Sequence, residues 1–325
     1  MSGRRPDRPV NRLLAVNVNG AEQWVLIRGS SSYNPVLLFL HGGPGFAQIG
    51  FAPAFQRELE EHFLVVNWDQ RGAGKSYTAH AVSEDTGLET YIADTAELVR
   101  WLLANTGQTK AFLVGHSWGS TLGIHTVRRH PELFSVFVGT GFGVQFQEGE
   151  RLSLQHLLAE AERRGDGKAL RRLQSIQFPI TEDTFDSYIK EKAKWMGRFG
   201  GYFHAKTGPL LRRALTSMAV SRRYSVRDYV RFVQGMRLGR EVARRIILEA
   251  DLFRQVPEVD VPVVFCIGRH DLHTPFELAR RYFEALRAPA KHWVWFDHSA
   301  HSPPFEEPQR FAEVLAELLP PLKAP

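Results

Sequence analysis

The chain has 325 residues, of which 43% are hydrophobic and 23% charged, and its formal net charge is +6. This length and apolar content allow one large α/β domain or two smaller units with a buried core, and they exclude a disordered chain. Met1 to Pro9 is polar and rich in arginine, without the apolar segment of a secretory signal. No run approaches the roughly 18 apolar residues of a membrane-spanning helix. We therefore expect a soluble, cytoplasmic protein with no membrane partner.

The positive charge is concentrated in one segment. Between Val144 and Val256 there are 22 Lys and Arg residues against 13 Asp and Glu, a net charge of +9, which leaves −3 for the rest of the chain. Such a surface could attract nucleic acid or anionic lipid. Because the basic residues recur at helical spacing among acidic ones, we interpret them as solvated helix faces and expect no nucleic-acid partner.

The N-terminal part alternates short apolar runs with turns. Leu13 to Val18 and Gln23 to Ile27 flank Asn19-Gly20, which predicts an antiparallel hairpin. A continuous apolar strand is expected at Val36 to Leu40 and another at Phe63 to Asn67. The loop after the second strand ends in Gly74-Lys75-Ser76, as a phosphate-binding P-loop does. The first glycine of that motif would fall at Asp69, so the P-loop interpretation fails.

Strands and helices continue to alternate toward the C-terminus. The pattern predicts strands at Phe112 to Val114, Phe134 to Val138, Val261 to Ile267 and Trp293 to Phe296, with helices ending near Gly107 and over residues 276–286 and 308–319. This alternation predicts an α/β fold with a mostly parallel central sheet flanked by helices on both faces. The single cysteine, Cys266, lies in one of these strands, which predicts a buried thiol and excludes an intramolecular disulfide.

Residues 144–256 have a different character. They contain no continuous strand-like run and several helical patterns, including Leu152 to Arg163 and Val226 to Met236. We interpret them as an all-helical cap inserted into a catalytic domain made of residues 1–143 and 257–325. Aromatic residues of the cap could line a pocket, although each taken singly more often belongs to a core. They are Trp195, Phe199, Tyr202, Phe203, Tyr224, Tyr229 and Phe232.

Gly115-His116-Ser117-Trp118-Gly119 has the pattern of a nucleophile elbow. An apolar strand precedes it, and a helical pattern follows from Thr121 to Val127. A serine at the tip of such a turn is held in a strained backbone conformation above the sheet, and the close packing requires glycine two residues on either side. Chance gives G-x-S-x-G in roughly one chain in ten of this length, so the flanking strand and helix carry the prediction.

Two further strand ends supply partners for Ser117. A serine hydroxyl becomes nucleophilic when a base removes its proton and a third group orients the base. Because parallel sheets present functional side chains at the carboxyl ends of their strands, Asp271 and His301 are expected near Ser117. The order Ser, Asp, His is that of α/β-hydrolases.

Each partner has an alternative. Asp271 could instead cap the following helix. A rival acid would have to lie at the end of the preceding sheet strand, but Gly139 to Gly143 contains no carboxylate. His298 is the alternative base, but His301 lies deeper in the loop and is favoured. His298-x-x-His301 with Asp271 also permits a zinc hypothesis, which leaves the elbow unexplained and lacks a closed ligand set. We expect no metal and no cofactor.

The oxyanion that develops during acyl transfer needs preorganised backbone donors. The N–H of Trp118, directly after the serine, is one, and the N–H of Gly43 in the first glycine-rich loop is expected to be the other. Pro44 has no N–H and cannot contribute.

Three motifs together resemble the proline iminopeptidase (prolyl aminopeptidase) family of α/β-hydrolases, the S33 peptidases. They are His41-Gly42-Gly43-Pro44-Gly45, Asp69-Gln70-Arg71-Gly72-Ala73-Gly74-Lys75-Ser76 and Gly115-His116-Ser117-Trp118-Gly119-Ser120. The resemblance covers the predicted catalytic domain on both sides of the insertion. It implies an α/β-hydrolase fold with a helical cap, Ser117, Asp271 and His301 as the catalytic residues, and Gly43 and Trp118 as oxyanion donors.

The cap departs from this family. The resemblance implies cap glutamates near a Trp-rich helix that hold the substrate's free amine, but no W-x-x-W-E-like segment occurs, and His116 stands where the elbow usually has a second glycine. Glu148 and Glu150 at the cap entrance, with Trp195 and Tyr202, are the candidate substrate-binding residues. A strongly basic cap is a poor place to bind a cationic amine.

The sequence therefore predicts a serine hydrolase that acts on a small molecule or short peptide by acyl transfer. Two substrate classes stay open: an N-terminal prolyl or aminoacyl amide, and an apolar ester or macrocyclic lactone. Two other functional classes are the alternatives to a serine hydrolase: a metal-dependent hydrolase and a non-catalytic binding protein. Epoxide hydrolase and dehalogenase chemistry is disfavoured because those members of the fold use a carboxylate where this chain has Ser117. The sequence leaves open whether the chain forms a homo-oligomer.

Overall fold

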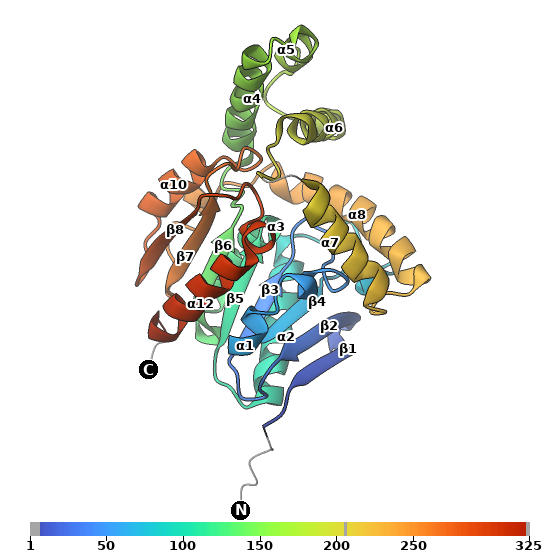
Figure 1. Ribbon diagram of the computed structural model, residues 1–325, viewed down its shortest axis with the longest axis vertical. Helices are drawn as coiled ribbons and strands as arrows, with labels where there is room; N and C mark the ends of the chain where they lie inside the picture. The colour runs from blue at the N-terminus through green and yellow to red at the C-terminus, as the bar shows by residue number, and fades with distance from the viewer. Residues whose placement is uncertain (1–6, 205–206, 323–325) are drawn as a thin grey trace, which may run out of the picture.

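The computed structural model describes residues 7–204 and 207–322 (Figure 1). An eight-stranded sheet with the order β1-β2-β4-β3-β5-β6-β7-β8 forms its centre. β1 pairs antiparallel with β2 and β2 with β4, whereas the remaining pairs are parallel. The strands are β1 (Val10–Val18), β2 (Ala21–Gly29), β3 (Val36–Leu40), β4 (Leu64–Asp69), β5 (Ala111–His116), β6 (Phe134–Thr140), β7 (Val263–Gly268) and β8 (Lys291–Phe296).

The central strands are buried on both faces because their sequences are continuously apolar. Successive side chains of a strand point to opposite faces. In β3, Leu37 and Phe39 therefore pack under α1 (Leu59–His62) and α12 (Pro308–Leu322), while Leu38 and Leu40 pack with the helices of the other face. Those helices are α2 (Leu88–Thr106), α3 (Trp118–Arg129) and α10 (Phe276–Ala285). The expected α/β fold is confirmed.

Between β6 and β7 the described chain forms helices without a strand. α4 (Phe146–Arg163), α5 (Gly167–Gln174) and α6 (Glu182–Phe199) stand above the carboxyl ends of the strands, whereas α7 (Thr207–Val220) and α8 (Val226–Ile247) lie to one side (Figure 1). The insertion narrows to a neck at Gln145 and Asp251, which form an isolated β-bridge and a side-chain hydrogen bond of 3.0 Å. Trp195 and Phe199 belong to the buried core of α4 to α6.

Short elements complete the chain: the 3₁₀ helices η1 (Ala52–Ala54), η2 (Gly74–Ser76) and η3 (Pro131–Leu133), and the helices α9 (Leu252–Gln255) and α11 (Pro303–Glu306). The predicted hairpin turn is present, with φ of 47° at Asn19 and 78° at Gly20. All of the expected strands are present, most of them longer than predicted. Among the described residues no helix has the length and apolar character to cross a membrane. The first six residues of the polar N-terminal stretch lie outside the described residues.

Candidate active site

Ser117 lies at the turn between β5 and α3 with φ 55° and ψ −120°, a conformation that a residue with a side chain seldom adopts. Its backbone N–H donates to Thr140 O at 2.9 Å. The flanking glycines allow the tight turn: a Cβ on Gly115 would lie 2.3 Å from Gly119 O, and a Cβ on Gly119 would lie 2.2 Å from Leu40 O. A larger residue at either position would force the turn open.

His301 and Asp271 form a buried pair at the neighbouring strand ends. The Nδ1 of His301 lies 3.0 Å from Asp271 Oδ2, and the two residues are 6% and 2% exposed. Asp271 Oδ1 accepts the backbone N–H groups of His273 and Thr274, both at 2.9 Å. Thr274 Oγ1 donates to Asp271 Oδ2 at 2.8 Å. The carboxylate is thus fixed by three donors besides His301, and with Nδ1 engaged, the Nε2 of His301 is the ring atom left for a base.

The loop that carries His301 is held by its backbone from two sides. The His116 Nε2 donates to His301 O at 3.2 Å, and the backbone N–H of His301 donates to Tyr202 O at 3.2 Å. Burial and the nearby His301 lower the pKa of His116 to about 3, so its ring is neutral at physiological pH. A Cβ on Gly141, at φ 62°, would lie 2.7 Å from His301 Cε1. His301 is therefore packed against the elbow, the β6 end and the cap.

The first glycine-rich loop lies against Ser117. A Cβ on Gly42 would come within 3.3 Å of Ser117 Cβ, and Gly43 has φ 120°. The ring of His41 holds this loop, because Nδ1 donates to Gly42 O at 2.7 Å and Nε2 accepts the N–H of Gln70 at 3.1 Å. Burial lowers the pKa of His41 to about 4 and keeps the ring in the neutral form that this pair of bonds requires.

Gln70 connects this loop to the elbow. Its side-chain Nε2 donates to His41 O at 3.2 Å, and its Oε1 accepts the indole N–H of Trp118 at 3.0 Å. Neither Gly43 N nor Trp118 N has a hydrogen-bond acceptor within the described part of the chain. Both backbone N–H groups belong to residues that line the same cavity as Ser117. The arrangement offers two preorganised donors beside the serine.

That cavity has a volume of about 580 Å³ and lies between the sheet and the cap. Its floor contains Gly43, Ser117, Trp118 and His301. Most of the remaining wall is apolar, and the charged side chains among its described lining residues are Glu150 and Arg240. Apolar contributors from the cap include Phe146, Phe185, Ile189, Phe203, Met236 and Ile246.

The four candidate substrate-binding residues separate into two pairs. Glu150 and Tyr202 line the cavity, whereas Glu148 and Trp195 do not. Glu148 instead pairs with Arg151 at 2.7 Å and Arg281 at 3.6 Å. Trp195 is 1% exposed in the cap core and donates to Glu191 at 3.0 Å. Helical periodicity explains both outcomes, because neighbouring positions on α4 and α6 face different directions.

Glu150 is already engaged. Its Oε2 accepts from Lys192 Nζ at 2.6 Å and from the Tyr188 hydroxyl at 2.5 Å. Lys192 is 1% exposed and also donates to His273 O at 2.9 Å, which joins α6 to the loop of Asp271. The other carboxylate oxygen, Oε1, has no hydrogen-bond partner among the described residues. Sequence reasoning missed Lys192, since the pairing of α4 with α6 is tertiary.

His298 is exposed, and its backbone N–H donates to Glu307 at 3.1 Å. His301 is thus the histidine brought to Asp271. Within the described ranges no group of three or more His, Cys, Asp or Glu side chains is arranged to hold a metal ion. Gln70 and His116 belong to the motifs noted in the sequence, but their contacts, like those of His273 and Thr274, are evident only from the fold.

Comparison with known proteins agrees with this architecture. A family model described as alpha/beta hydrolase fold matches residues 35–308. The chain belongs to the α/β-hydrolase family. It is 35% identical over 303 residues to the probable aminopeptidase YbaC of Bacillus subtilis (strain 168), a match covering 93% of this chain and 94% of that protein.

Two further comparisons are with a proline iminopeptidase and with a solved structure of the same fold. This α/β-hydrolase is 27% identical over 299 residues to the proline iminopeptidase of Neisseria meningitidis serogroup B, covering 87% of this chain and 89% of that one. A proline iminopeptidase-related protein from Thermus thermophilus has the same fold, with a TM-score of 0.66, 20% identity and coverage of 97% and 99%. The resemblance seen in the sequence motifs is confirmed, and the protein is a hydrolase.

Proposed function

We propose that this α/β-hydrolase acts as a serine hydrolase through Ser117, His301 and Asp271. The observation that carries the proposal is the shared cavity, in which a serine at φ 55° lies with a histidine whose Nδ1 is 3.0 Å from a buried carboxylate. A serine in such a turn and a histidine oriented by a carboxylate are the components of acyl-transfer catalysis. No cofactor takes part in the proposed reaction.

The reaction follows from these groups. Ser117 Oγ attacks the substrate carbonyl carbon while His301 Nε2 takes its proton, and the N–H groups of Gly43 and Trp118 stabilise the oxyanion. His301 then gives the proton to the leaving amine or alkoxide, which breaks the C–N or C–O bond and leaves an acyl-enzyme. Water attacks the acyl carbon, its proton passes through His301 to Ser117, and the free acid departs.

An N-terminal prolyl or aminoacyl amide is the substrate class we place first. Glu150 is the carboxylate among the described cavity residues, and its Oε1 is available to a substrate ammonium. The relatives named as aminopeptidase and proline iminopeptidase support this choice. Tyr202 lines the same cavity, and its backbone carbonyl accepts the N–H of His301; we propose that its ring contacts the acyl part together with the phenylalanines of the wall.

An apolar ester or macrocyclic lactone is the second candidate, because of Lys192. Its ammonium lies 2.6 Å from Glu150 Oε2 and neutralises the charge that would attract a substrate amine. The largely apolar cavity wall suits a neutral acyl group equally well.

The first test compares initial rates on a prolyl arylamide, short and medium aryl esters and a macrocyclic lactone, using the wild type and Ser117→Ala. Ser117→Ala and His301→Ala should each lower turnover at least about 10³-fold without loss of folding, whereas exposed His298→Ala should retain most of it. An organophosphonate probe should label the wild type at Ser117. If Ser117→Ala kept its activity and were still labelled by this probe, the serine mechanism would be refuted.

The substrate class is tested with the double variant Glu150→Gln/Lys192→Met, which removes both charges together and avoids leaving one buried charge unpaired. If Glu150 binds the substrate amine, KM for the prolyl arylamide should rise about tenfold or more while KM for a neutral aryl ester stays within about twofold. Equal changes for both substrates would assign Glu150 a structural role and favour the ester or lactone class.

A further inference from the structure

The outer surface of α7 and α8 carries an unusual share of exposed apolar side chains. Among the described residues eight large hydrophobic side chains are markedly exposed, and six of them lie here. Val226 is 81% exposed and Val220 72%. The six, which we call the α7–α8 surface, are Leu211, Leu215, Val220, Val226, Val230 and Val233. Val226, Val230 and Val233 recur at helical spacing on one face of α8, and exposed apolar side chains arranged in this way are typical of a surface that meets an apolar partner.

The charged side chains of α7, the following loop and most of α8 are almost all positive. Residues 207–240 contain eight arginines and one carboxylate, Asp228. Asp228 is 4% exposed and is occupied by Lys75 at 2.8 Å and by the Ser225 backbone at 2.8 Å. Arg212, Arg222, Arg227 and Arg237 are exposed and have no ion-pair partner within the described chain.

The rest of the cap is different. On α4 to α6 most arginines are paired: Arg151 with Glu148, Arg163 and Arg164 with Glu160, Arg172 with Glu191, and Arg198 with Asp166, whereas Arg171 has no ion-pair partner among the described residues. The interpretation of the basic cap as solvated helix faces with mixed charges therefore fits α4 to α6. It does not fit α7 and α8, where unpaired arginines alternate with exposed aliphatic residues.

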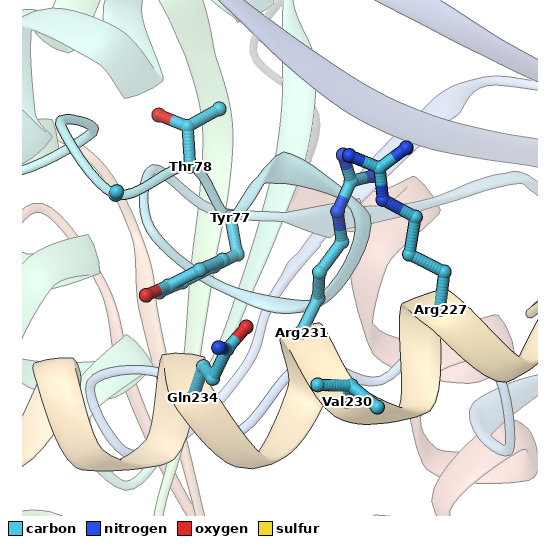
Figure 2. Close-up of a pocket in the computed structure, with 7 residues that line it drawn as sticks. Tyr77, Thr78, Arg227, Val230, Arg231 and Gln234 are labelled. Carbon is cyan, nitrogen blue, oxygen red and sulfur yellow. The ribbon is translucent and has the colours of Figure 1, made fainter.

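A groove at the inner edge of this surface combines both features. It has a volume of about 330 Å³ and is lined by α8 and the loop of Tyr77 and Thr78. Arg227 and Arg231 extend from one face of α8 toward that loop, with Val230 and Gln234 beside them (Figure 2). Arg231 also lies 3.5 Å from Asp228, whereas Arg227 has no ion-pair partner among the described residues. Two guanidinium groups four residues apart on one helix can donate to the same phosphate group.

We propose that the α7–α8 surface binds an anionic phospholipid bilayer. The leucines and valines would enter the boundary between headgroups and acyl chains, and the arginines, with the groove at Arg227 and Arg231, would bind lipid phosphates. A second copy of this chain is disfavoured because matching surfaces would bring the unpaired arginines of each copy together. A nucleic acid would leave the aliphatic side chains without an apolar partner.

The position of the α7–α8 surface relative to the active-site cavity gives membrane binding a functional consequence. Phe46 is 45% exposed, lines the active-site cavity and packs on Phe232 of α8, with ring centroids 5.6 Å apart. Met236, further along α8 than Val230, lines the cavity as well. Docking would therefore bring the cavity mouth close to the lipid surface, where apolar substrates concentrate. The docking itself does not depend on the substrate class proposed for the cavity.

The proposal is tested by sedimentation of the full chain with vesicles of phosphatidylcholine alone or mixed with phosphatidylglycerol. We expect at least about tenfold tighter binding to the mixed vesicles at low salt, and weakening as salt rises. Arg227→Gln/Arg231→Gln and Val226→Ser/Val230→Ser should each lower binding about tenfold. Lys168→Gln/Arg171→Gln on α5 removes the same charge from exposed positions and should bind as the wild type does.

Three results would overturn the proposal. The first is equal sedimentation with both vesicle types, or equal loss in the α5 control. The second is binding of inorganic phosphate, abolished by Arg227→Gln/Arg231→Gln, without vesicle binding, which would show a small-anion site. The third is a dimer in light scattering that Val226→Ser/Val230→Ser dissociates, which would assign the surface to a second copy. Unchanged far-ultraviolet circular dichroism would verify that the variants fold.

Discussion

His116 bonds the loop of His301 although it stands directly beside Ser117. Its Nε2 donates to His301 O at 3.2 Å and lies 3.1 Å from Ser302 Oγ. The resemblance to proline iminopeptidases implies glycine at this position, where such a bond could not form. The ring therefore gives this chain a link between the elbow and the histidine loop that the motif alone does not provide.

His116→Phe keeps an aromatic ring but removes the donor to His301 O. We expect it to lower kcat about tenfold with little change in KM, because the position of His301 would be less well fixed while the shape of the cavity would stay the same. His116→Gln can still donate and should recover part of that loss. The check is a kcat and KM series on one aryl ester. A change confined to KM would show that His116 contacts substrate.

Buried neutral histidines also set the pH dependence of stability. Burial lowers the pKa of His41 to about 4 and that of His116 to about 3, whereas an unfolded histidine has a pKa of about 6.5. Between these values the unfolded chain binds more protons than the folded one, so the free energy of unfolding falls as pH falls. For His41 alone the loss between pH 6.5 and 4 amounts to about 3 kcal/mol.

We therefore expect urea unfolding to show decreasing stability from pH 6.5 downward. His41→Gln, which does not titrate, should reduce the slope of unfolding free energy against pH by about one proton in this range. The variant is less stable at neutral pH because it loses the ring bonds to Gly42 and Gln70, so the slope and not the absolute stability is the readout. An unchanged slope would mean that His41 is protonated in the folded state.

At the scale of elements, α8 meets the core loops through glycine. A Cβ on Gly239 would lie 2.0 Å from Pro44 O, and a Cβ on Gly235 would lie 2.8 Å from Gly72 O. On the side of the loop, Gly45 has φ 91°, and a Cβ there would lie 2.3 Å from Gly235 O. The cap helix thus contacts the backbone of the loop whose Gly43 N–H is the proposed oxyanion donor.

Gly239→Ala should displace the Pro44 peptide and with it Gly43, lowering kcat about 10- to 100-fold. Gly197→Ala is the matched control, because a Cβ inside α6 at that position meets nothing within 4 Å. The control should keep full activity and gain up to about 1 kcal/mol of stability from helix propensity. Both are assayed by initial rates and thermal unfolding. Full activity in Gly239→Ala would show that the loop is independent of α8.

The strands were predictable because each central one is a continuous apolar run ended by glycine or a polar residue, as in β3 and β5. The triad candidates follow from this, since parallel strands bring their carboxyl ends to one edge. The cap was harder. Its helices vary in length, and the starts of α6 and α8 are marked only by the capping boxes at Thr181 and Ser225. Contacts such as Lys192 with Glu150 join separate helices and leave no pattern in the sequence.

At the scale of the whole molecule, Asp69 joins cap and core. It ends β4, is fully buried, and accepts the Tyr224 hydroxyl at 2.5 Å and the Lys75 N–H at 2.9 Å. Burial raises the pKa of Asp69 to about 6, so the ionised form depends on these donors. Lys75 in turn reaches Asp228 on α8 at 2.8 Å. One loop of the core thereby fixes the start of α8.

Tyr224→Phe removes one donor from Asp69 and should lower the free energy of unfolding by about 1–3 kcal/mol at pH 7, where the carboxylate is ionised. The loss should shrink below pH 6, because a protonated Asp69 needs that donor less. Urea titrations at pH 5 and pH 7 measure the difference. A pH-independent loss would indicate that the hydroxyl contributes packing alone.

β6 and β7 pair side by side at Phe137 and Val263, although the whole cap is made between them. On the ribosome, Ser117 therefore emerges well before Asp271 and His301. In the proposed mechanism a nascent chain displays Ser117 without its base, so a chain arrested within the cap should be inert. Hydrolysis would begin only after β7 and β8 have joined the sheet, and the appearance of activity would then report that translation and folding of the sheet are complete.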